Sequence, residues 1–485
     1  MKQLIALLFA AFMCSSVSAF KRIDEAKSVQ YDNYIHTLAE IIQIFEARYY
    51  GTIDAESSMS KAIQGFTQQD PHTGYLEKKV FKDLSEKMQG EFYGIGIVLP
   101  GDKKQEEEFF PVIETVPGGP AEKAGVKQGD KVIQINETLV KGLEIDEIMS
   151  HLKGEKQTTV TIKILRDKYP EPLTITVTRD VVKDEMALAY HFPEHNVHYL
   201  LLSIFSEKSG KHVETIITKA LEEKSNGIII DLRNNTGGLF DSAIDIAGLF
   251  LPKGTLVASM KQQGGRVTGT FKTNRTPLAI PKNLPIIIIV NNYTASASEI
   301  LAGTLQIYAA KKNLLSVFVI GDETFGKGSV QEVIPLSNES ALKLTTGLYF
   351  LPFETSIQGK GVIPDFKLEY RTPPSETIKW MTSSYGRESA LKGSIKPQTA
   401  EEKQDTKDGK EKEKPTKEED KPWKERRKDI LAQDYFVQNA INLINGHKIG
   451  IAAYPKKFST RNSALEFLKN SYVIDRQLTL SDIKL

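Results

Sequence analysis

The stretch PIIIIVNNYTASASEILAGTLQIYAA, residues 285–310, decides the fold of this chain. Its first part, Pro285 to Val290, is an unbroken and mostly β-branched run, which is typical of a strand buried on both faces. Two asparagines break the run, and apolar residues then recur at helical spacing. Ser296 therefore stands where a strand ends and a helix begins, a place where backbone N–H groups and the helix dipole favour negative charge. Strand, turn and helix in this order indicate an α/β protein.

A second strand, Leu314 to Ile320, leads into GDETFGKGSVQ at residues 321–331. Lys327 lies between two glycines, so no neighbouring side chain shields it. If the backbone from Lys327 to Gln331 is extended, alternate side chains face the same way, and Gln331 can hold the lysine amine in line with Ser296. Lysine can act as a base when burial lowers its pKa, because desolvation disfavours the ammonium form. The two stretches thus predict a serine–lysine pair.

Simpler interpretations of these motifs stay open. Ser296-Ala297-Ser298-Glu299 is also a capping box at a helix start. Gly326-Lys327-Gly328 alone is typical of a turn. The run from Gly321 to Lys327 begins like a phosphate-binding loop, but that motif needs Ser or Thr next, and Gly328 stands there. A strand pattern follows instead of a helix, which disfavours a nucleotide site.

Taken together, TASASEILAG and GDETFGKGSVQ resemble the signature of the carboxy-terminal processing proteases, the tail-specific serine peptidases of the S41 type. The resemblance implies Ser296 as nucleophile, Lys327 as general base and Gln331 as the partner that orients the lysine. It implies an α/β protease core with crotonase-like, ClpP-type βαβ layers, and no metal or other cofactor. The connection from Gln306 to Ile320 is longer than is usual in that family, so we expect a longer surface segment around Lys311 to Asn313.

The sequence DLRNNTGG, residues 231–238, follows the predicted buried strand Ile228 to Leu232 and precedes a helical pattern. Its glycine pair permits close backbone approach and suits an oxyanion hole. A similar element lies near the active site of the resembled family. By that resemblance, Gly237 or Gly238 would bind the oxyanion together with the N–H of Ala297, and the sequence leaves open which glycine donates.

Residues 91–180 are rich in short strands and glycine turns, in an order that resembles a protease-associated PDZ domain. Such domains bind an extended peptide tail by strand addition and hold its carboxylate in a backbone-lined pocket. We expect Gly94, Ile95 and Gly96 to offer N–H groups to that carboxylate. A purely structural β module with ordinary turn glycines is the alternative.

Composition and the first residues limit the class of protein. The 485 residues suffice for two or three domains, and a net charge of +1 gives no argument for nucleic acid. Residues 1–19 read as a secretory signal, with Lys2, a short apolar run and the cleavage-site pattern Val17-Ser18-Ala19. The single cysteine, Cys14, lies inside this segment, so we expect no disulfide after cleavage. These features predict an exported bacterial protein, most simply a periplasmic one.

These patterns predict six segments. They are a signal peptide (1–19), an N-terminal helical region (20–90), a PDZ domain (91–180), a serine protease core (181–372), a charged linker (373–429) and a C-terminal helical region (430–485). The first helical region contains Asp70-Pro71-His72-Thr73, which matches another element of the family, and we interpret His72 as structural. The linker is dense in charges of both signs and poor in apolar residues, as in disordered segments.

The sequence thus predicts an exported serine endopeptidase whose PDZ domain positions the C-terminal tails of protein or peptide substrates. The expected chemistry is acyl transfer through an acyl-enzyme. A homo-oligomer or an adaptor stays open, and we expect no nucleic-acid partner and no membrane span after signal cleavage. The rival functions are a non-catalytic PDZ scaffold and a nucleotide-binding protein.

Overall fold

A computed structural model gives the fold of the chain. It describes residues 25–89, 92–98, 108–112, 114–116, 118–143, 145–167, 169–182, 187–368, 431, 433–453, 458 and 460–470. The predicted signal peptide and charged linker lie outside these residues. The chain divides into one compact unit that ends at Phe66 and a second that begins at Thr67. The first unit holds the helices α2 (Glu25–Arg48) and α3 (Ala55–Thr67), and the ring of Tyr31 meets that of Phe66 edge-on at 6.2 Å.

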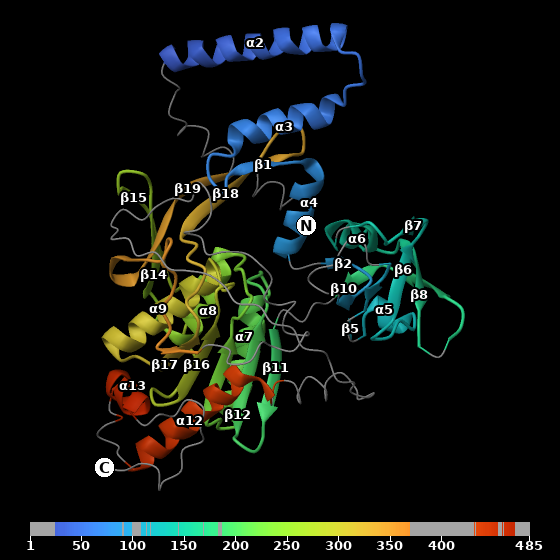
Figure 1. Ribbon diagram of the computed structural model, residues 1–485. Coiled ribbons are helices and arrows are strands. Elements are labelled where there is room, and N and C mark those ends of the chain that lie inside the picture. Colours follow the sequence, from blue (N-terminus) through green and yellow to red (C-terminus); the bar gives the residue numbers. More distant parts are fainter. Residues whose placement is uncertain are drawn as a thin grey trace. The chain divides into compact units, whose positions relative to one another are not determined.

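A six-stranded sheet forms the centre of the second unit (Figure 1). Its strands, in spatial order, are β11 (Ala187–Phe192), β12 (Val197–Leu202), β13 (Gly227–Asp231), β16 (Pro285–Val290), β17 (Ser316–Gly321) and β21 (Phe366–Lys367). The strands from β12 to β21 are parallel, and β11 closes one edge in the antiparallel sense. Parallel neighbours end at the same edge of the sheet, so the segments after β13, β16 and β17 meet there.

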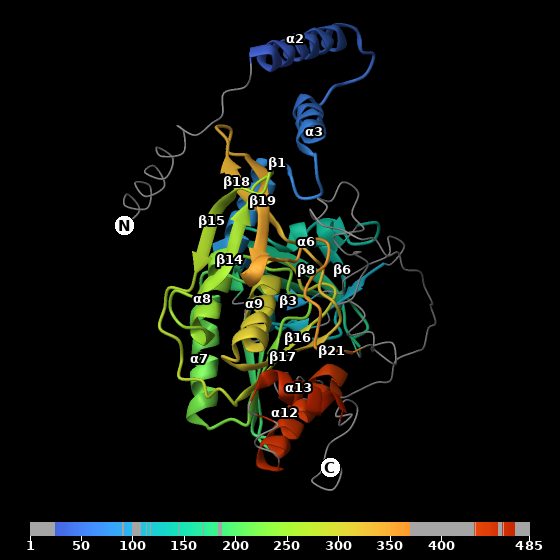
Figure 2. The same cartoon turned by 90° about the vertical axis from the view of Figure 1, so that its left-hand side faces the viewer.

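Helices cover both faces of this sheet (Figure 2). Ile228 and Ile230 pack on one side and Ile229 on the other, as the alternation of a strand requires. One face is covered by α7 (Ser209–Glu222), α8 (Phe240–Phe250) and α9 (Ala297–Lys312), and the other by α12 (Tyr435–Ala453) and α13 (Arg461–Asn470). Every residue of β16 is buried, so the prediction of a strand buried on both faces is confirmed.

A second sheet is built around the long strand β19 (Ala341–Leu351). The remaining strands are β1 (Gly74–Leu76), β14 (Leu256–Lys261), β15 (Val267–Lys272), β18 (Ser329–Pro335) and β20 (Thr355–Ser356), with the short helix η2 (Pro352–Glu354) before β20. Strand β1 precedes helix α4 (Lys78–Gln89) and pairs antiparallel with β19. A segment expected to be helical thus contributes a strand to this sheet.

The residues between α4 and β11 form a separate hydrophobic core. One sheet there contains β4 (Phe110–Pro111), β6 (Lys131–Ile135), β7 (Thr138–Leu139), β8 (Thr159–Leu165) and β9 (Leu173–Thr178). Two further pairs join β2 (Phe92–Gly94) to β10 (Asp180–Val182) and β3 (Ile97–Val98) to β5 (Glu114–Thr115), beside the helices α5 (Pro120–Lys123) and α6 (Ile145–Leu152). The strands β4 and β5, which follow each other in the chain, belong to different sheets.

Within the residues that the structure describes, none of the helices has the length and apolar character needed to cross a membrane.

Candidate active site

Ser296 lies in a tight turn between β16 and α9, as the sequence predicts. Its φ of 58° and ψ of −118° are unfavourable for a residue with a Cβ, and such strain costs about 1–3 kcal/mol. The turn is held by the segment after β13. The carbonyl oxygen of Asn235 accepts hydrogen bonds from the Ala295 N–H at 3.0 Å and the Ser298 hydroxyl at 2.9 Å. Strain at this one serine is therefore maintained by contacts from a neighbouring strand end.

Glu299 joins the serine turn to the lysine loop. Its Oε2 atom accepts hydrogen bonds from the backbone N–H of Ser296 at 2.8 Å and of Lys327 at 2.9 Å. Its Oε1 atom accepts from the Gly326 N–H at 2.7 Å and from the Thr324 hydroxyl. One carboxylate oxygen thus fixes the backbones of the serine and the lysine against each other.

This carboxyl group is fully buried, and burial raises its pKa to about 6, although the four hydrogen bonds it accepts act in the opposite direction. Glu299 is also the acid of the predicted capping box, since it binds the N–H of the residue that starts the helix. The cap interpretation and the active-site interpretation of Ser296 therefore use the same contact, and they do not exclude each other.

Lys327, Ser329 and Gln331 come together as the expected alternation predicts. The Lys327 Nζ donates to the Gln331 Oε1, and the Gln331 Nε2 donates to the Ser329 hydroxyl at 2.9 Å and the Thr345 hydroxyl at 3.3 Å. The lysine side chain is half-buried, and its backbone is anchored by Glu299. The Lys327 amine is thus held by Gln331, and no histidine takes part in these described hydrogen bonds.

The two glycines after β13 have different surroundings. A Cβ at Gly237 would lie 2.9 Å from the Cβ of Ser296 and 3.1 Å from the backbone nitrogen of Ala297, so the glycine lies directly against the serine turn. The N–H of Gly237 donates to the Asn235 Oδ1 at 2.9 Å. Gly238, with a φ of 133°, lies against the backbone of Phe205. The N–H of Gly237 is therefore engaged within its own loop.

The segment Gly94-Ile95-Gly96 connects β2 to β3 in the smaller β-rich core. The Ile95 carbonyl accepts from the Ala121 N–H at 2.7 Å, and the Gly96 carbonyl accepts from the Val116 N–H at 2.8 Å. The side chain of Ile95 is buried, and Gly96 has a φ of 73°, a conformation that favours glycine. The carbonyl groups of the segment are thus fixed inside its domain.

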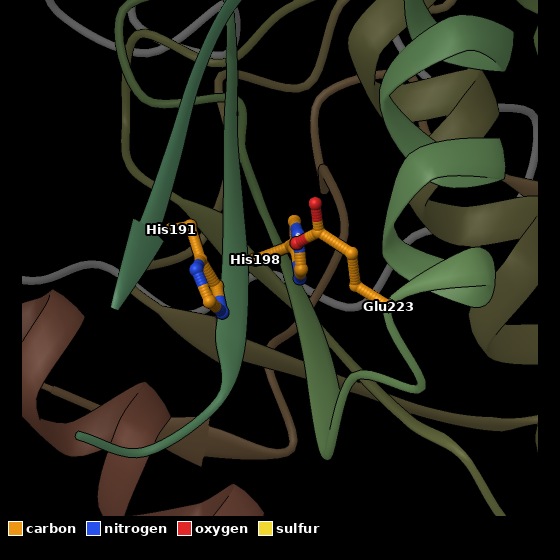
Figure 3. A group of neighbouring side chains, drawn as sticks. All are labelled: His191, His198 and Glu223. Atoms are coloured by element: carbon orange, nitrogen blue, oxygen red, sulfur yellow. Dashed lines mark hydrogen bonds and ion pairs between the residues drawn. The ribbon is translucent and has the colours of Figure 1, made fainter. Parts of the chain in front are cut away.

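One group of potential metal ligands occurs in the described residues, far from these loops in the sequence: His191, His198 and Glu223 (Figure 3). The two imidazoles stack at 4.4 Å with 26° between their planes. Ring nitrogen lone pairs lie in the ring planes, so stacked rings do not converge on one ion. The His198 Nε2 is hydrogen-bonded to the Glu223 Oε2 at 2.9 Å, and its Nδ1 is hydrogen-bonded to the Ser225 hydroxyl at 3.1 Å. We interpret the group as a hydrogen-bonded structural cluster.

Sequence reasoning missed three residues of this site. Glu299 was noted only as part of a helix cap, although the capping motif was the signal that identified it. Asn235 stands in the DLRNNTGG element, but its contacts with the Ala295 N–H and the Ser298 hydroxyl lie outside that element, whereas Thr345 gave no signal, because its partner Gln331 lies on another strand. The expected surface segment near Lys311 to Asn313 is the exposed C-terminal end of α9, where Asn313 adopts the left-handed conformation.

Comparisons with known proteins place this arrangement in a family. Residues 196–368 match peptidase family S41, and residues 83–165 match the PDZ domain. A carboxy-terminal-processing protease of Bartonella bacilliformis is 33% identical over 405 residues, which cover 82% of this chain and 89% of that protein. A probable CtpA-like serine protease of Staphylococcus aureus is 28% identical over 376 residues, covering 77% of this chain and 71% of that protein.

Among solved structures, the photosystem II D1 C-terminal processing protease is 26% identical and has a TM-score of 0.41; the match covers 69% of this chain and 87% of that protein. The chain therefore belongs to peptidase family S41, among the carboxy-terminal-processing proteases, and is a serine-type peptidase with a PDZ domain. The family and the enzyme class predicted from the sequence are confirmed.

Proposed function

We propose that this protein is an exported endopeptidase in which Ser296 is the nucleophile, Lys327 the general base and Gln331 the partner that orients the lysine. The observation that carries the proposal is the position of Glu299, whose Oε2 atom binds the backbone N–H groups of both Ser296 and Lys327. This contact fixes the two reacting residues at adjacent positions, as a nucleophile and its base require.

In the proposed reaction, the neutral amine of Lys327 takes the proton from the Ser296 hydroxyl as the serine oxygen attacks a peptide carbonyl. The lysine then gives that proton to the leaving amine, and an acyl-enzyme remains. Water, deprotonated by the same lysine, attacks the ester, and the lysine returns that proton to the Ser296 oxygen as the new carboxyl end leaves. The hydrogen bond from the Lys327 Nζ to the Gln331 Oε1 uses an N–H of the amine and not the lone pair that would take the serine proton.

We assign the oxyanion hole to the N–H groups of Gly238 and Ala297. Gly237 was an equal candidate in the sequence, but its N–H donates to the Asn235 side chain. Gly237 instead provides the space that brings this loop against Ser296. Ala297 is the first residue of α9, so its N–H lies at the positive end of the helix dipole, where it can stabilise a developing negative charge.

The PDZ domain is proposed to bind the C-terminal tail of the substrate, with the backbone N–H groups at Gly94, Ile95 and Gly96 facing its carboxylate. The fixed carbonyl groups of this segment support the assignment, because they hold its backbone in one position. Amidating the C-terminus of a test peptide removes the charge and should slow its cleavage at low concentration. Equal rates for the free and amidated forms would contradict this role.

The remaining proposals concern the wider architecture. Residues 1–19 have the pattern of a secretory signal, which supports export, most simply to a bacterial periplasm. The parallel order of β12, β13, β16 and β17, with helices on both faces, supports crotonase-like, ClpP-type layering of the protease core. The predicted domain boundaries stay proposals as well.

The test of the catalytic assignment compares Ser296→Ala and Lys327→Arg in the cleavage of casein. Both should lose activity, since arginine keeps the charge but cannot give up a proton in the working pH range. Lys360→Arg is the matched control, because Lys360 also lies between two glycines and is exposed. If Ser296 were only a helix cap, Ser296→Ala would lower stability by about 1 kcal/mol and keep activity.

A further inference from the structure

The turn from Asp70 to Thr73 packs against the second sheet, and the residues that it contacts there lie far away in the sequence. The Asp70 Oδ1 accepts the backbone N–H groups of His72 at 2.8 Å and of Thr73 at 3.0 Å, which closes the turn. The next residues form β1, and Gly74 pairs with Lys343 of β19. The register of these strands therefore brings the carboxylate of Asp70 to the middle of β19.

Asp70 and Thr73 together hold Thr345. The backbone N–H of Thr345 donates to the Thr73 hydroxyl oxygen at 3.0 Å, and the Thr345 hydroxyl donates to the Asp70 Oδ1 at 3.1 Å. The Thr73 hydroxyl in turn donates to the Asp70 Oδ2 at 2.6 Å. Both the main chain and the side chain of Thr345 are thus fixed by the same turn.

Thr345 lies directly opposite Gln331 in the β18–β19 ladder, next to a register shift between Val330 and Gln331. The Gln331 Nε2 donates to the Thr345 hydroxyl oxygen at 3.3 Å, while the Oε1 accepts from the Lys327 Nζ. Asp70, Thr345, Gln331 and Lys327 therefore form one chain of hydrogen bonds, which we call the polar relay.

Asp70, at one end of the polar relay, sets which groups donate and which accept along the chain of hydrogen bonds. Burial alone would raise the pKa of Asp70, but hydrogen bonds from Thr73, His72 and Thr345 lower it overall, so the group is a carboxylate that only accepts. The Thr345 hydroxyl must then donate to Asp70, and its lone pairs face Gln331. An amide can meet those lone pairs only with its NH2 group, which turns its oxygen toward Lys327.

We propose that Asp70 and Thr345 are positioning residues that hold the Gln331 amide with its oxygen toward the Lys327 amine. The inference rests on the proposed function, in which Lys327 is the base. Ser329 cannot set this direction, because a serine hydroxyl either donates or accepts. With the amide reversed, its NH2 group would donate to the lysine nitrogen and occupy the lone pair that must take the serine proton.

The test uses Thr345→Val, which keeps the β-branched shape of the strand residue and removes the hydroxyl. Thr346→Val is the matched control, since Thr346 is the next residue and its hydroxyl bonds instead to Glu332, at 3.1 Å on the exposed surface. Thr345→Ser restores the hydroxyl and should restore most activity. Should Thr345→Val fold poorly, the pair Thr345→Ala and Thr345→Ser differs only by the oxygen atom.

Casein cleavage and the rate of serine labelling by a fluorophosphonate should both fall about ten- to a hundredfold in Thr345→Val. The melting temperatures of Thr345→Val and Thr346→Val are measured beside the rates, so that a loss through misfolding is seen directly. The effect on cleavage should lie in kcat and leave KM near its wild-type value, because Thr345 acts on the reaction through the Gln331 amide and the lysine base.

The pH profile separates positioning from a structural effect. Accepting a hydrogen bond from the ammonium form raises the pKa of a lysine, so loss of the ordered amide oxygen lowers it. The acid side of the Thr345→Val profile should therefore move to lower pH. The identified carboxylates near Lys327 are Glu299, bound to its backbone, and Asp70 at the end of the relay, and both are unchanged in Thr345→Val and Thr346→Val alike.

Two results overturn the inference, and they differ. If Ser296→Ala is inactive while Thr345→Val matches Thr346→Val in rate and pH profile, the relay has no positioning role and the catalytic pair stands. If Ser296→Ala keeps full activity, the catalytic pair fails and the inference fails with it. The inference is supported if Thr345→Val loses activity and shows a shifted pH profile, and if Thr345→Ser recovers the activity.

Discussion

Two buried carboxylates in the protease core are stabilised in opposite ways. Glu299, beneath the serine and lysine loops, accepts hydrogen bonds from three backbone N–H groups and one hydroxyl, all of them uncharged donors. Asp231, at the end of β13, is paired with the guanidinium of Arg233, which also contacts Asp434 at 2.9 Å. Both acids are almost completely inaccessible to solvent.

The Asp231 group places one guanidinium between two carboxylates and joins distant parts of the fold. Arg233 packs over the ring of Phe436 at 5.1 Å, and Asp434 accepts the N–H of Phe436 at the start of α12. The Tyr199 hydroxyl donates to Asp231 at 2.9 Å. This group attaches the C-terminal helix to the central sheet, so we interpret its role as structural.

The hydrogen bonds around Glu299 join two loops. A cation beside Glu299 would satisfy the carboxylate with one partner, whereas backbone N–H groups from two loops satisfy it only when both loops are in place. The energetic consequence is visible in its raised pKa, since burial of the charge is only partly offset. The comparison teaches that the core acid paired with a cation joins a distant helix to the sheet, while the acid held by dipoles joins the serine turn to the lysine loop.

The largest effect on stability should come from removing the guanidinium of Arg233. Arg233→Met leaves Asp231 and Asp434 facing each other without compensation, and loss of one partner from a buried pair costs about 3–5 kcal/mol. Urea unfolding measures this loss. The triple variant Asp231→Asn, Arg233→Met, Asp434→Asn should recover much of it, because no unpaired charge then remains. Equal stability of Arg233→Met and wild type would contradict the structural role.

Glu299→Gln should instead lower activity more than stability. The amide has one oxygen and one NH2 group, so the NH2 group must face either the N–H groups of Ser296 and Lys327 or the N–H of Gly326. We expect a loss of roughly a hundredfold in kcat/KM for casein, since small displacements of reacting groups have effects of that order. Glu332→Gln on the exposed side of β18 is the control for the same chemical change.

The strands and turns around Ser296 and Lys327 could be predicted from the sequence, because they depend on local signals. The apolar run over β16, the helix after Ser296 and the glycines at 237 and 238 each follow from neighbouring residues. The structure adds that the Gly237 N–H donates to the Asn235 side chain, and this contact supports the proposal of Gly238 as the donor.

The contacts between distant segments could not be predicted in this way. Asp70 and Thr345 are 275 residues apart, and they meet only because β1 pairs with β19 in one register. A shift of one residue in either ladder would turn Thr345 to the other face of its strand. The irregular pairing at Gln331 is likewise invisible in the residue pattern, which shows only alternation.

The smallest predicted effect is the pH dependence that Glu299 gives to stability. Its pKa is about 6 in the folded chain against 4.5 for an ordinary glutamate, so the folded state keeps a proton that the unfolded state has released. The contribution to stability is therefore fully present below pH 4.5 and is lost as the pH rises through about 6. A shift of this size corresponds to about 2 kcal/mol.

Buried histidines act in the opposite direction over nearby pH values, because burial lowers the pKa of His198 and lowers that of His447 to about 4. The comparison that isolates Glu299 is therefore the difference in unfolding free energy between wild type and Glu299→Gln, measured with urea at several pH values. Both chains share the histidines, so their effects cancel. The difference should fall by about 2 kcal/mol, in favour of the glutamine variant, as the pH rises from below 4.5 to above 6. A difference that stays constant across this range would mean that the uncharged donors around Glu299 fully offset the cost of burying its charge.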